Sequence, residues 1–240
     1  MHEDVRQILR QWDRPRYLAH LFAPDASRDA LCALYAFAAE ISRVPLAVSD
    51  PQIGLIRLQW WRDVLEGIAG GKPQQHPVAA ALAQTISTYA LPMAPLHSLI
   101  DAHERDLFTE RPETVPVLEE YLGKTSSALI QLAAMILAPK LAPAVAEAAG
   151  LSGVAFGIAL IVNDRKRYAN LVPEGEDAAS LAHLARRRLA EARAKQVPAG
   201  MLPAFLHVTL TELFLEARGT PPAQWRMQWQ LWRAARRETF

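Results

Sequence analysis

The sequence lacks a second cysteine, and therefore an internal disulfide, and it lacks the common catalytic motifs. Its single cysteine, Cys32, lies among apolar residues in DALCALYAFAAE, which predicts a buried thiol in a reducing compartment. The N-terminus, MHEDVRQILRQWDR, has neither the apolar core of a signal peptide nor an Arg- and Ser-rich, acid-poor character. We therefore expect a cytoplasmic protein or one that has already been processed. Walker, GxGxxG, HExxH, paired CxxC and GxSxG motifs are also missing, which argues against the enzyme classes they mark.

An excess of charge of either sign is absent as well. Lys and Arg number 26 against 25 Asp and Glu, so the net charge is +1 and gives no general attraction to nucleic acid. With 240 residues, of which 51% are hydrophobic, the chain can bury a substantial core. No linker rich in Gly, Ser or charge and no repeat divides it. We predict one domain over residues 1–240.

Strand patterns are missing too, because no run of Val, Ile, Thr and aromatic residues alternates with polar ones. The 17 prolines instead separate segments of helical length in which apolar residues recur at spacings of three and four. The sequence predicts an all-α protein with helices at 25–44, 53–68, 78–90, 94–108, 117–137, 144–167, 178–194, 201–217 and 223–237.

The stretch from Gly150 to Pro173 combines the most apolar segment with an abrupt polar ending. Residues 151–162 carry no charge, and Gly153 and Gly157 lie four apart on one helical face, where another helix or a ligand could approach closely. This pattern is typical of tight core packing, and the alternative is a pocket wall with Asp164 at its mouth. Because Glu147 interrupts the segment and small residues dominate it, we predict a buried helix rather than a membrane span.

Basic residues cluster at two places. Arg165, Lys166 and Arg167 follow the apolar stretch, where they either bind a phosphate or face solvent. Near the C-terminus, a tryptophan stripe is flanked by arginines: Trp225, Trp229 and Trp232 with Arg226, Arg233, Arg236 and Arg237. Such a helix suits a membrane headgroup region or an acidic partner, and the alternative is that its Trp face packs on the core.

Four blocks in order give the sequence a family resemblance. They are RYLAHLFAPDASRDALCALYAF, GLIRLQWWRDVLEG, LIDAHERDLF with LEEYLGKTSSALIQL, and the Gly150–Pro173 stretch. Together they resemble the squalene/phytoene synthase family, whose members condense two prenyl diphosphates. The resemblance covers most of the chain and implies the all-α isoprenoid-synthase fold, built around a central apolar cavity.

Two aspartate-rich clusters hold magnesium and diphosphate in that family, each with acids one helical turn apart. The resemblance places the first pair of acids at Ser42 and Leu46, and the second at Asp164 and Tyr168. Only Asp164 is acidic, and it is a weak metal candidate by itself. Glu40 lies two residues from an expected position, a rotation of roughly 200°. We therefore expect no catalytic residue, no metal site and no cofactor.

The resemblance implies that several residues line a pocket: Tyr35, Glu40, Tyr121, Gly153, Gly157 and Asp164. Tyr121 matches a pocket tyrosine of the family, although a tyrosine there is equally suited to the core. The missing acids of the two clusters, together with Gly153, Gly157 and GLIRLQWWRD, make the sequence resemble one branch of the family. That branch includes an assembly factor of mitochondrial respiratory complex I.

The resemblance to this branch implies a non-catalytic protein that assists assembly of a membrane respiratory complex, with respiratory subunits and the surface of the inner membrane as partners. One alternative is a Mg²⁺-dependent prenyl transferase with rearranged acids, namely Glu40, Asp101, Asp106 and Asp164. The other is a carrier of an isoprenoid or lipid.

Overall fold

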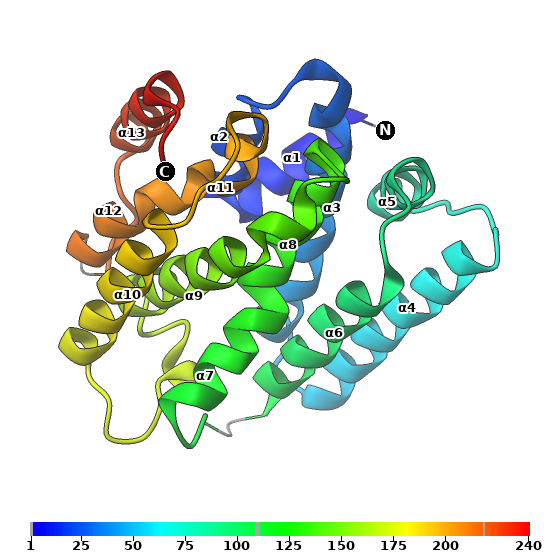
Figure 1. Ribbon diagram of the computed structural model, residues 1–240. Coiled ribbons are helices and arrows are strands. Elements are labelled where there is room, and N and C mark those ends of the chain that lie inside the picture. Colours follow the sequence, from blue (N-terminus) through cyan, green and yellow to red (C-terminus); the bar gives the residue numbers. More distant parts are fainter. Residues whose placement is uncertain (1, 109–110, 218) are drawn as a thin grey trace. The chain divides into compact units, whose positions relative to one another are not determined.

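The computed structural model describes residues 2–108, 111–217 and 219–240. They form helices and connecting turns, and no strand occurs in these ranges, which confirms the all-α prediction (Figure 1). The chain divides into two compact units, Met1–Glu110 and Arg111–Phe240, here called unit 1 and unit 2. The single domain and the central cavity stay predictions.

Unit 1 is built around α3, whose residues from Leu31 to Ala39 are buried without interruption. Helices α1 and α5 pack on α3, while α4 pairs with α6. Arg62 of α4 links that pair, because its guanidinium donates to Asp101 and Glu104 of α6. The helices of unit 1 are α1 (His2–Trp12), α2 (Arg14–His20), α3 (Asp25–Arg43), α4 (Pro51–Ala69), α5 (Pro77–Tyr89) and α6 (Met93–Glu104), with 3-10 turns at Val44–Leu46 and Arg105–Leu107.

The sequence pattern missed α1 and α2. The first has a narrow apolar face that buries Val5 and Leu9, and the second begins at Arg14 after the N-cap Asp13, whose carboxylate accepts from the Arg16 backbone N–H. Polar residues dominate both segments, so the apolar spacing was too sparse to reveal them. Cys32 is buried, as predicted, and burial raises the pKa of its thiol to about 12.

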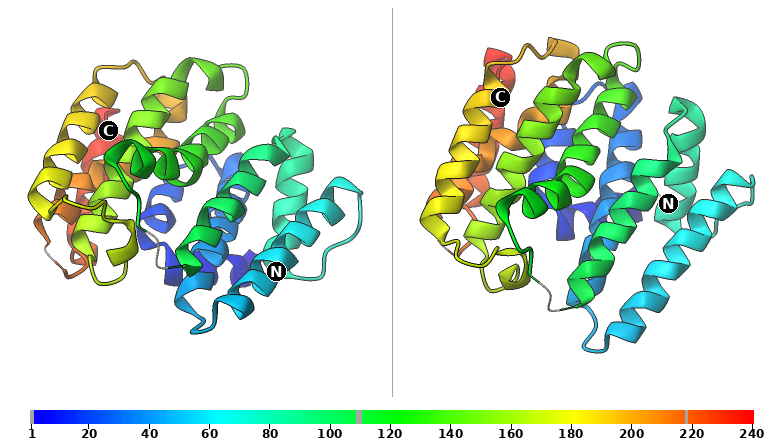
Figure 2. Two further views of the ribbon diagram at one scale, coloured as in Figure 1. Left: turned by 90° about the horizontal axis from the view of Figure 1, so that it is seen from below. Right: turned by 60° about the horizontal axis from the view of Figure 1, so that its bottom comes forward.

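Unit 2 is built around α9 (Ala146–Asn163), the helix predicted to be buried. Helix α10 packs along it, as the views in Figures 1 and 2 show, and α12 and the α7–α8 segment cover further sides. By length and composition, 142–163 is the one stretch of the described residues that could cross a membrane, but 67% of its apolar window is buried inside the protein. The other helices are α7 (Val115–Leu122), α8 (Ala128–Leu137), α10 (Ala178–Arg193), α11 (Leu202–Phe205), α12 (Thr211–Glu216) and α13 (Gln224–Arg237).

Helices α7 and α8 form one rod, interrupted by a π-helical turn at Gly123–Ser127. A π turn widens the helix by one residue per turn and often marks a functional site. Gly153 of α9 faces this turn so closely that a Cβ there would lie 2.4 Å from the backbone N and Cα of Ser127. Gly157 faces Leu122 and Ser126, where an added Cβ would lie 2.5 Å from a Leu122 methyl. The glycine pair therefore permits the close helix approach that its spacing indicated.

Replacing Gly153 with alanine should destabilise unit 2, because rigid backbone lies where the new methyl group must go. Overpacking of this kind costs about 1–3 kcal/mol. Gly150, also in α9, is the matched control, since a Cβ there meets nothing within 4 Å. Gly150→Ala should be neutral or stabilising by about 1 kcal/mol, because alanine is the better helix former. Urea unfolding measures both, and equal effects of the two variants would contradict the packing described.

His20 should make the stability of unit 1 depend on pH. Burial lowers the pKa of its imidazole, despite the Tyr17 carbonyl oxygen 2.5 Å from Nδ1. As the pH falls below about 6.5, the His20 imidazole is therefore protonated in the unfolded chain but stays neutral in the folded unit. The contribution of His20 to the free energy of unfolding is therefore complete above that pH. It is lost as the pH falls below it, by up to about 1.4 kcal/mol per pH unit. In urea unfolding measured from pH 7.5 to 5, His20→Asn should remove this loss of stability. His183→Asn, which replaces an exposed histidine, should leave the loss in place. Parallel curves of stability against pH for the unchanged chain and both variants would refute the assignment to His20.

Candidate functional site

The first place to examine is the end of α3, where the resemblance puts one pair of metal-binding acids. Helix α3 ends at Arg43, and Pro45 lies in the 3-10 turn that follows. Ser42 is in the last turn of α3, and its hydroxyl donates to the Ala39 carbonyl at 3.1 Å. Leu46 is exposed and lies beyond the helix. The two positions therefore hold no acid, and they lie in different elements, Ser42 in α3 and Leu46 in the 3-10 turn.

The second place is the end of α9. We predicted a helix through Arg167, and this was wrong, because α9 ends at Asn163 and Asp164 has non-helical angles (φ −119°, ψ 68°). The Asp164 carboxylate accepts from the Arg167 backbone N–H at 3.1 Å, a local hydrogen bond that competes with continuation of the helix. Asp164 and Tyr168 therefore lie in a turn after the helix, joined by a hydrogen bond from the Tyr168 N–H to the Asp164 carbonyl at 3.1 Å, and only Asp164 of the two is acidic.

The basic cluster after α9 divides into two parts. Arg165 and Lys166 are exposed, in agreement with the solvent-facing alternative. Arg167 is half-buried, and its guanidinium lies over the Tyr168 ring, 5.1 Å from the centroid. Its cation is therefore held against an aromatic ring of the same turn.

The acids of the enzyme alternative have local partners. Glu40 is half-buried and accepts from Arg43 at 2.9 Å, Asp101 accepts from Arg62 at 2.7 Å, and Asp106 pairs with His103 at 2.7 Å. Within each unit, the described residues contain no group of three or more Asp, Glu, His or Cys that could hold a metal ion. A magnesium ion bound to diphosphate requires several convergent carboxylates, so the residues present at the two expected places do not fit it.

The two candidate pocket tyrosines lie in different units. Tyr35 of α3 is fully buried with the Arg16 guanidinium 5.9 Å from its ring centroid, and burial raises its pKa well above the usual value. Tyr121 of α7 is buried directly before the π turn, and its carbonyl accepts from the Thr125 hydroxyl at 2.9 Å. In unit 2 the structure thus brings Tyr121, Gly153 and Gly157 to the same pair of segments, α7 with its π turn and α9.

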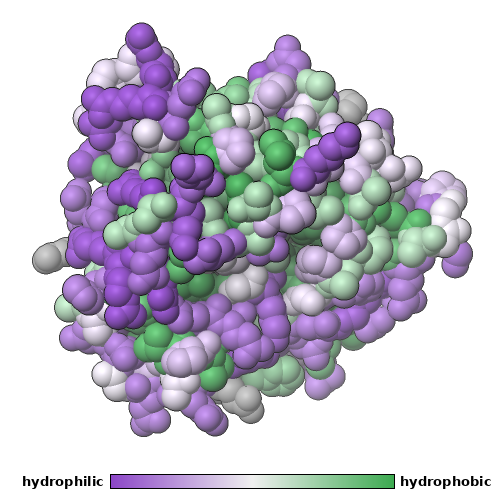
Figure 3. Space-filling model, viewed as in Figure 1, coloured by the Kyte–Doolittle hydropathy of each residue, from purple (hydrophilic) through white to green (hydrophobic). Residues whose placement is uncertain are grey.

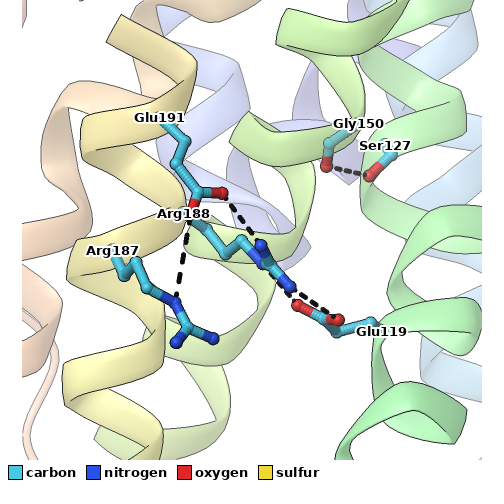
Figure 4. A network of polar contacts seen from close by, with 6 residues as sticks. All are labelled: Glu119, Ser127, Gly150, Arg187, Arg188 and Glu191. Carbon is cyan, nitrogen blue, oxygen red and sulfur yellow. Dashed lines mark hydrogen bonds and ion pairs between the residues drawn. The ribbon is translucent and has the colours of Figure 1, made fainter. Parts of the chain in front are cut away.

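An ion-pair network that the sequence did not reveal joins α7 to α10. Arg188 of α10 binds Glu119 of α7 through two parallel hydrogen bonds of 2.6 and 3.0 Å (Figure 4). It also donates to Glu191 at 2.9 Å, and these carboxylates raise the pKa of the guanidinium. The partners are separated by 69 residues, so no local pattern could indicate the contact. The carboxylates of Glu119 and Glu191 are therefore both paired with Arg188.

The C-terminal tryptophans have an unambiguous place in unit 2. Helix α13 packs through Met227, Leu231 and Ala234, which are buried. The predicted stripe lies on the opposite side and is exposed: Trp225 by 68%, Trp229 by 55% and Trp232 by 42%. The alternative in which the Trp face packs on the core is therefore wrong, and the face is open to another molecule.

Comparison with known proteins places this architecture in a family. The sequence pattern that defines squalene/phytoene synthases matches residues 9–170, so the chain belongs to the squalene/phytoene synthase family. The crystal structure of a dehydrosqualene synthase in complex with ligand superposes with a TM-score of 0.74 at 16% identity, over 98% of this chain and 95% of that one. The fold is thus the isoprenoid-synthase fold, as predicted.

Sequence relatives fall into two groups. Human NADH dehydrogenase (ubiquinone) complex I, assembly factor 6 is 34% identical over 134 residues, which are 56% of this chain and 40% of that protein. The 15-cis-phytoene synthase of Synechocystis is 29% identical over 139 residues, 57% of this chain and 40% of that protein. The aligned part thus spans about two-fifths of these relatives' length. The chain is similar to an assembly factor and, at lower identity, to an enzyme.

Arg188→Ala should destabilise unit 2 by about 1–3 kcal/mol, because it removes a two-pronged charged contact between helices and leaves Glu119 without its arginine. Its neighbour Arg187 is the matched control. That side chain is 56% exposed and only reaches Glu191 at 4.0 Å, so Arg187→Ala should change the free energy of unfolding by less than about 0.5 kcal/mol. Urea unfolding compares the two, and a smaller loss for Arg188→Ala than for Arg187→Ala would be inconsistent with the network.

Proposed function

We propose that this chain is a non-catalytic member of the squalene/phytoene synthase family that acts, attached to the membrane surface, in assembly of a membrane respiratory complex. The observation that carries the proposal is that the two expected places hold one acid, Asp164, and that the described residues contain no group of three or more possible metal ligands. The similarity to assembly factor 6 of complex I supports the same role.

The physical argument concerns charge. Ionisation of a prenyl diphosphate leaves a pyrophosphate anion, and stabilising it requires metal ions held by several carboxylates. At the two expected places this chain offers Ser42, Leu46, Asp164 and Tyr168, a single carboxylate among four positions. That carboxylate accepts a backbone N–H of its own turn. The fold would then be retained for binding partners or an apolar molecule rather than for prenyl transfer.

Release of pyrophosphate is the direct test of lost chemistry. With farnesyl or geranylgeranyl diphosphate and Mg²⁺, the purified chain should release none above background, because the metal site is incomplete. In calorimetric titration, the affinity for farnesyl diphosphate should be the same with and without Mg²⁺, and the same in the Asp164→Ala variant. Magnesium-dependent binding that needs Asp164 and leads to release would establish the prenyl transferase alternative instead.

The assembly role requires a cellular measurement. In a host strain without the chain, native gels should show less assembled NADH-oxidising complex, while the prenyl products remain unchanged. Restoration by the Asp164→Ala variant would be expected, since the role does not use the metal site. Normal assembly in the deleted strain would reject the role, and a copurified isoprenoid or lipid would point to a carrier.

A further inference from the structure

Helix α13 has two apolar faces, and the fold of unit 2 uses only one of them. Met227, Leu231 and Ala234 recur at spacings of four and three and pack inward, against the segment Leu206–Leu210. Trp225, Trp229 and Trp232 recur at the same spacings, displaced by about half a helical turn. Such a displacement places the two stripes on opposite sides of the helix, so the tryptophans form a ridge on its outer side.

The ridge is organised before any partner arrives. The rings of Trp229 and Trp232 stack, with centroids 5.0 Å apart and an interplanar angle of 23°. The Arg236 guanidinium lies 5.0 Å from the centroid of the Trp232 ring. Trp225, Gln228, Trp229 and Trp232 border a shallow hollow of about 510 Å³. A preformed aromatic surface loses little side-chain entropy on binding.

Positive charge accompanies the ridge. Within α13 there are four arginines and no acid, namely Arg226, Arg233, Arg236 and Arg237, although the whole chain has a net charge of only +1. The surface over α13 is accordingly coloured mostly hydrophilic at the upper left of Figure 3. The helical period places Arg236 on the ridge and the other three arginines along one flank of it, so positive charge lies beside the exposed tryptophans.

A second cationic feature lies on the flank of the same helix. Arg233 and Arg237 of α13 line a pocket of about 430 Å³ together with Arg193 and Lys195. Burial lowers the pKa of the Arg193 guanidinium, which donates to the Phe240 carbonyl at 2.7 Å. Lys195 also pairs with Glu147 at 2.6 Å, and Glu238 lines the hollow, so the side chains there that favour an anionic group of headgroup size are chiefly Arg233 and Arg237.

We propose that the outer face of α13 docks on a bilayer surface that contains anionic phospholipid. The tryptophans lie at the level of the headgroups and the arginines contact the phosphates, as aromatic and basic residues do at membrane interfaces. The helix rests on the surface, because its 14 residues are too few to span a bilayer and its inner face is fixed to unit 2. The ridge contains tryptophan, glutamine and arginine without aliphatic residues, which suits the headgroup level better than the interior of a protein interface.

This inference deepens the membrane attachment in the proposed function and rests on it for its biological meaning. Vesicle binding by the purified chain tests the docking surface without the respiratory complex. Vesicle binding without an assembly defect would remove only the proposed function, and an assembly defect without vesicle binding would remove only the docking surface.

The experiment is sedimentation of the full chain with vesicles of phosphatidylcholine alone or with one-quarter phosphatidylglycerol. Binding should require phosphatidylglycerol and weaken with salt, since it depends on screened charge. The triple variant Trp225→Gln, Trp229→Gln, Trp232→Gln should bind at least tenfold more weakly. Trp60→Gln, which removes an exposed tryptophan of unit 1, is the matched control and should bind like the unchanged chain.

A second variant keeps the test independent of the tryptophans. Arg233→Gln with Arg237→Gln should lower the affinity about fivefold per arginine and reduce the salt dependence, because each contributes about one unit charge near the surface. Circular dichroism checks that every variant is folded. Failure to bind phosphatidylglycerol vesicles, or equal weakening by Trp60→Gln, would overturn the proposal, and the α13 face would then be a site for a protein partner.

Discussion

The close contact between Gly153 and the backbone of Ser127 is the constraint on which unit 2 depends. Because no Cβ intervenes, α9 approaches the π turn at backbone distance, and Ser127 uses its hydroxyl to donate to the Gly150 carbonyl at 2.8 Å. With α7 held there, Glu119 comes within reach of Arg188 on α10. The packing of α7, α8 and α10 around α9 therefore depends on the absence of a side chain at Gly153.

The ends of α3 and α9 differ from the acid pairs that the family resemblance places there. Metal binding at the helix ends would need several acidic side chains there, whereas the core needs only the buried apolar residues of the two helices. Here Pro45 follows the first helix and the Asp164 carboxylate closes a turn after the second. Neither ending disturbs the buried residues of its helix, so the packing of each helix does not depend on acidic residues at these positions.

Much of this architecture could be predicted from the sequence, and the exceptions have physical reasons. The period of apolar residues located α3, α4 and α9 within a few residues, because burial dictates that period. Helices α1 and α2 are mostly polar, so their period is weak. The Arg188–Glu119 contact and the outward direction of the Trp stripe depend on which face the rest of the unit covers, and an amphipathic pattern alone cannot tell two apolar faces apart. The Asp164 turn was missed because a side-chain hydrogen bond ended the helix.

The π turn at Gly123–Ser127 gives α7 and α8 different angular phases within one rod. If the turn became α-helical with its length unchanged, α7 would rotate relative to α8 by about 100°, because five α-helical residues turn further than five π-helical ones. The aromatic ring of Tyr121 and the carboxylate of Glu119 would then face new neighbours, while the core contacts of α8 stayed in place. The wider pitch of this turn therefore sets which side of α7 faces α10, and deletion of one residue that restored an α-helix would largely keep that orientation.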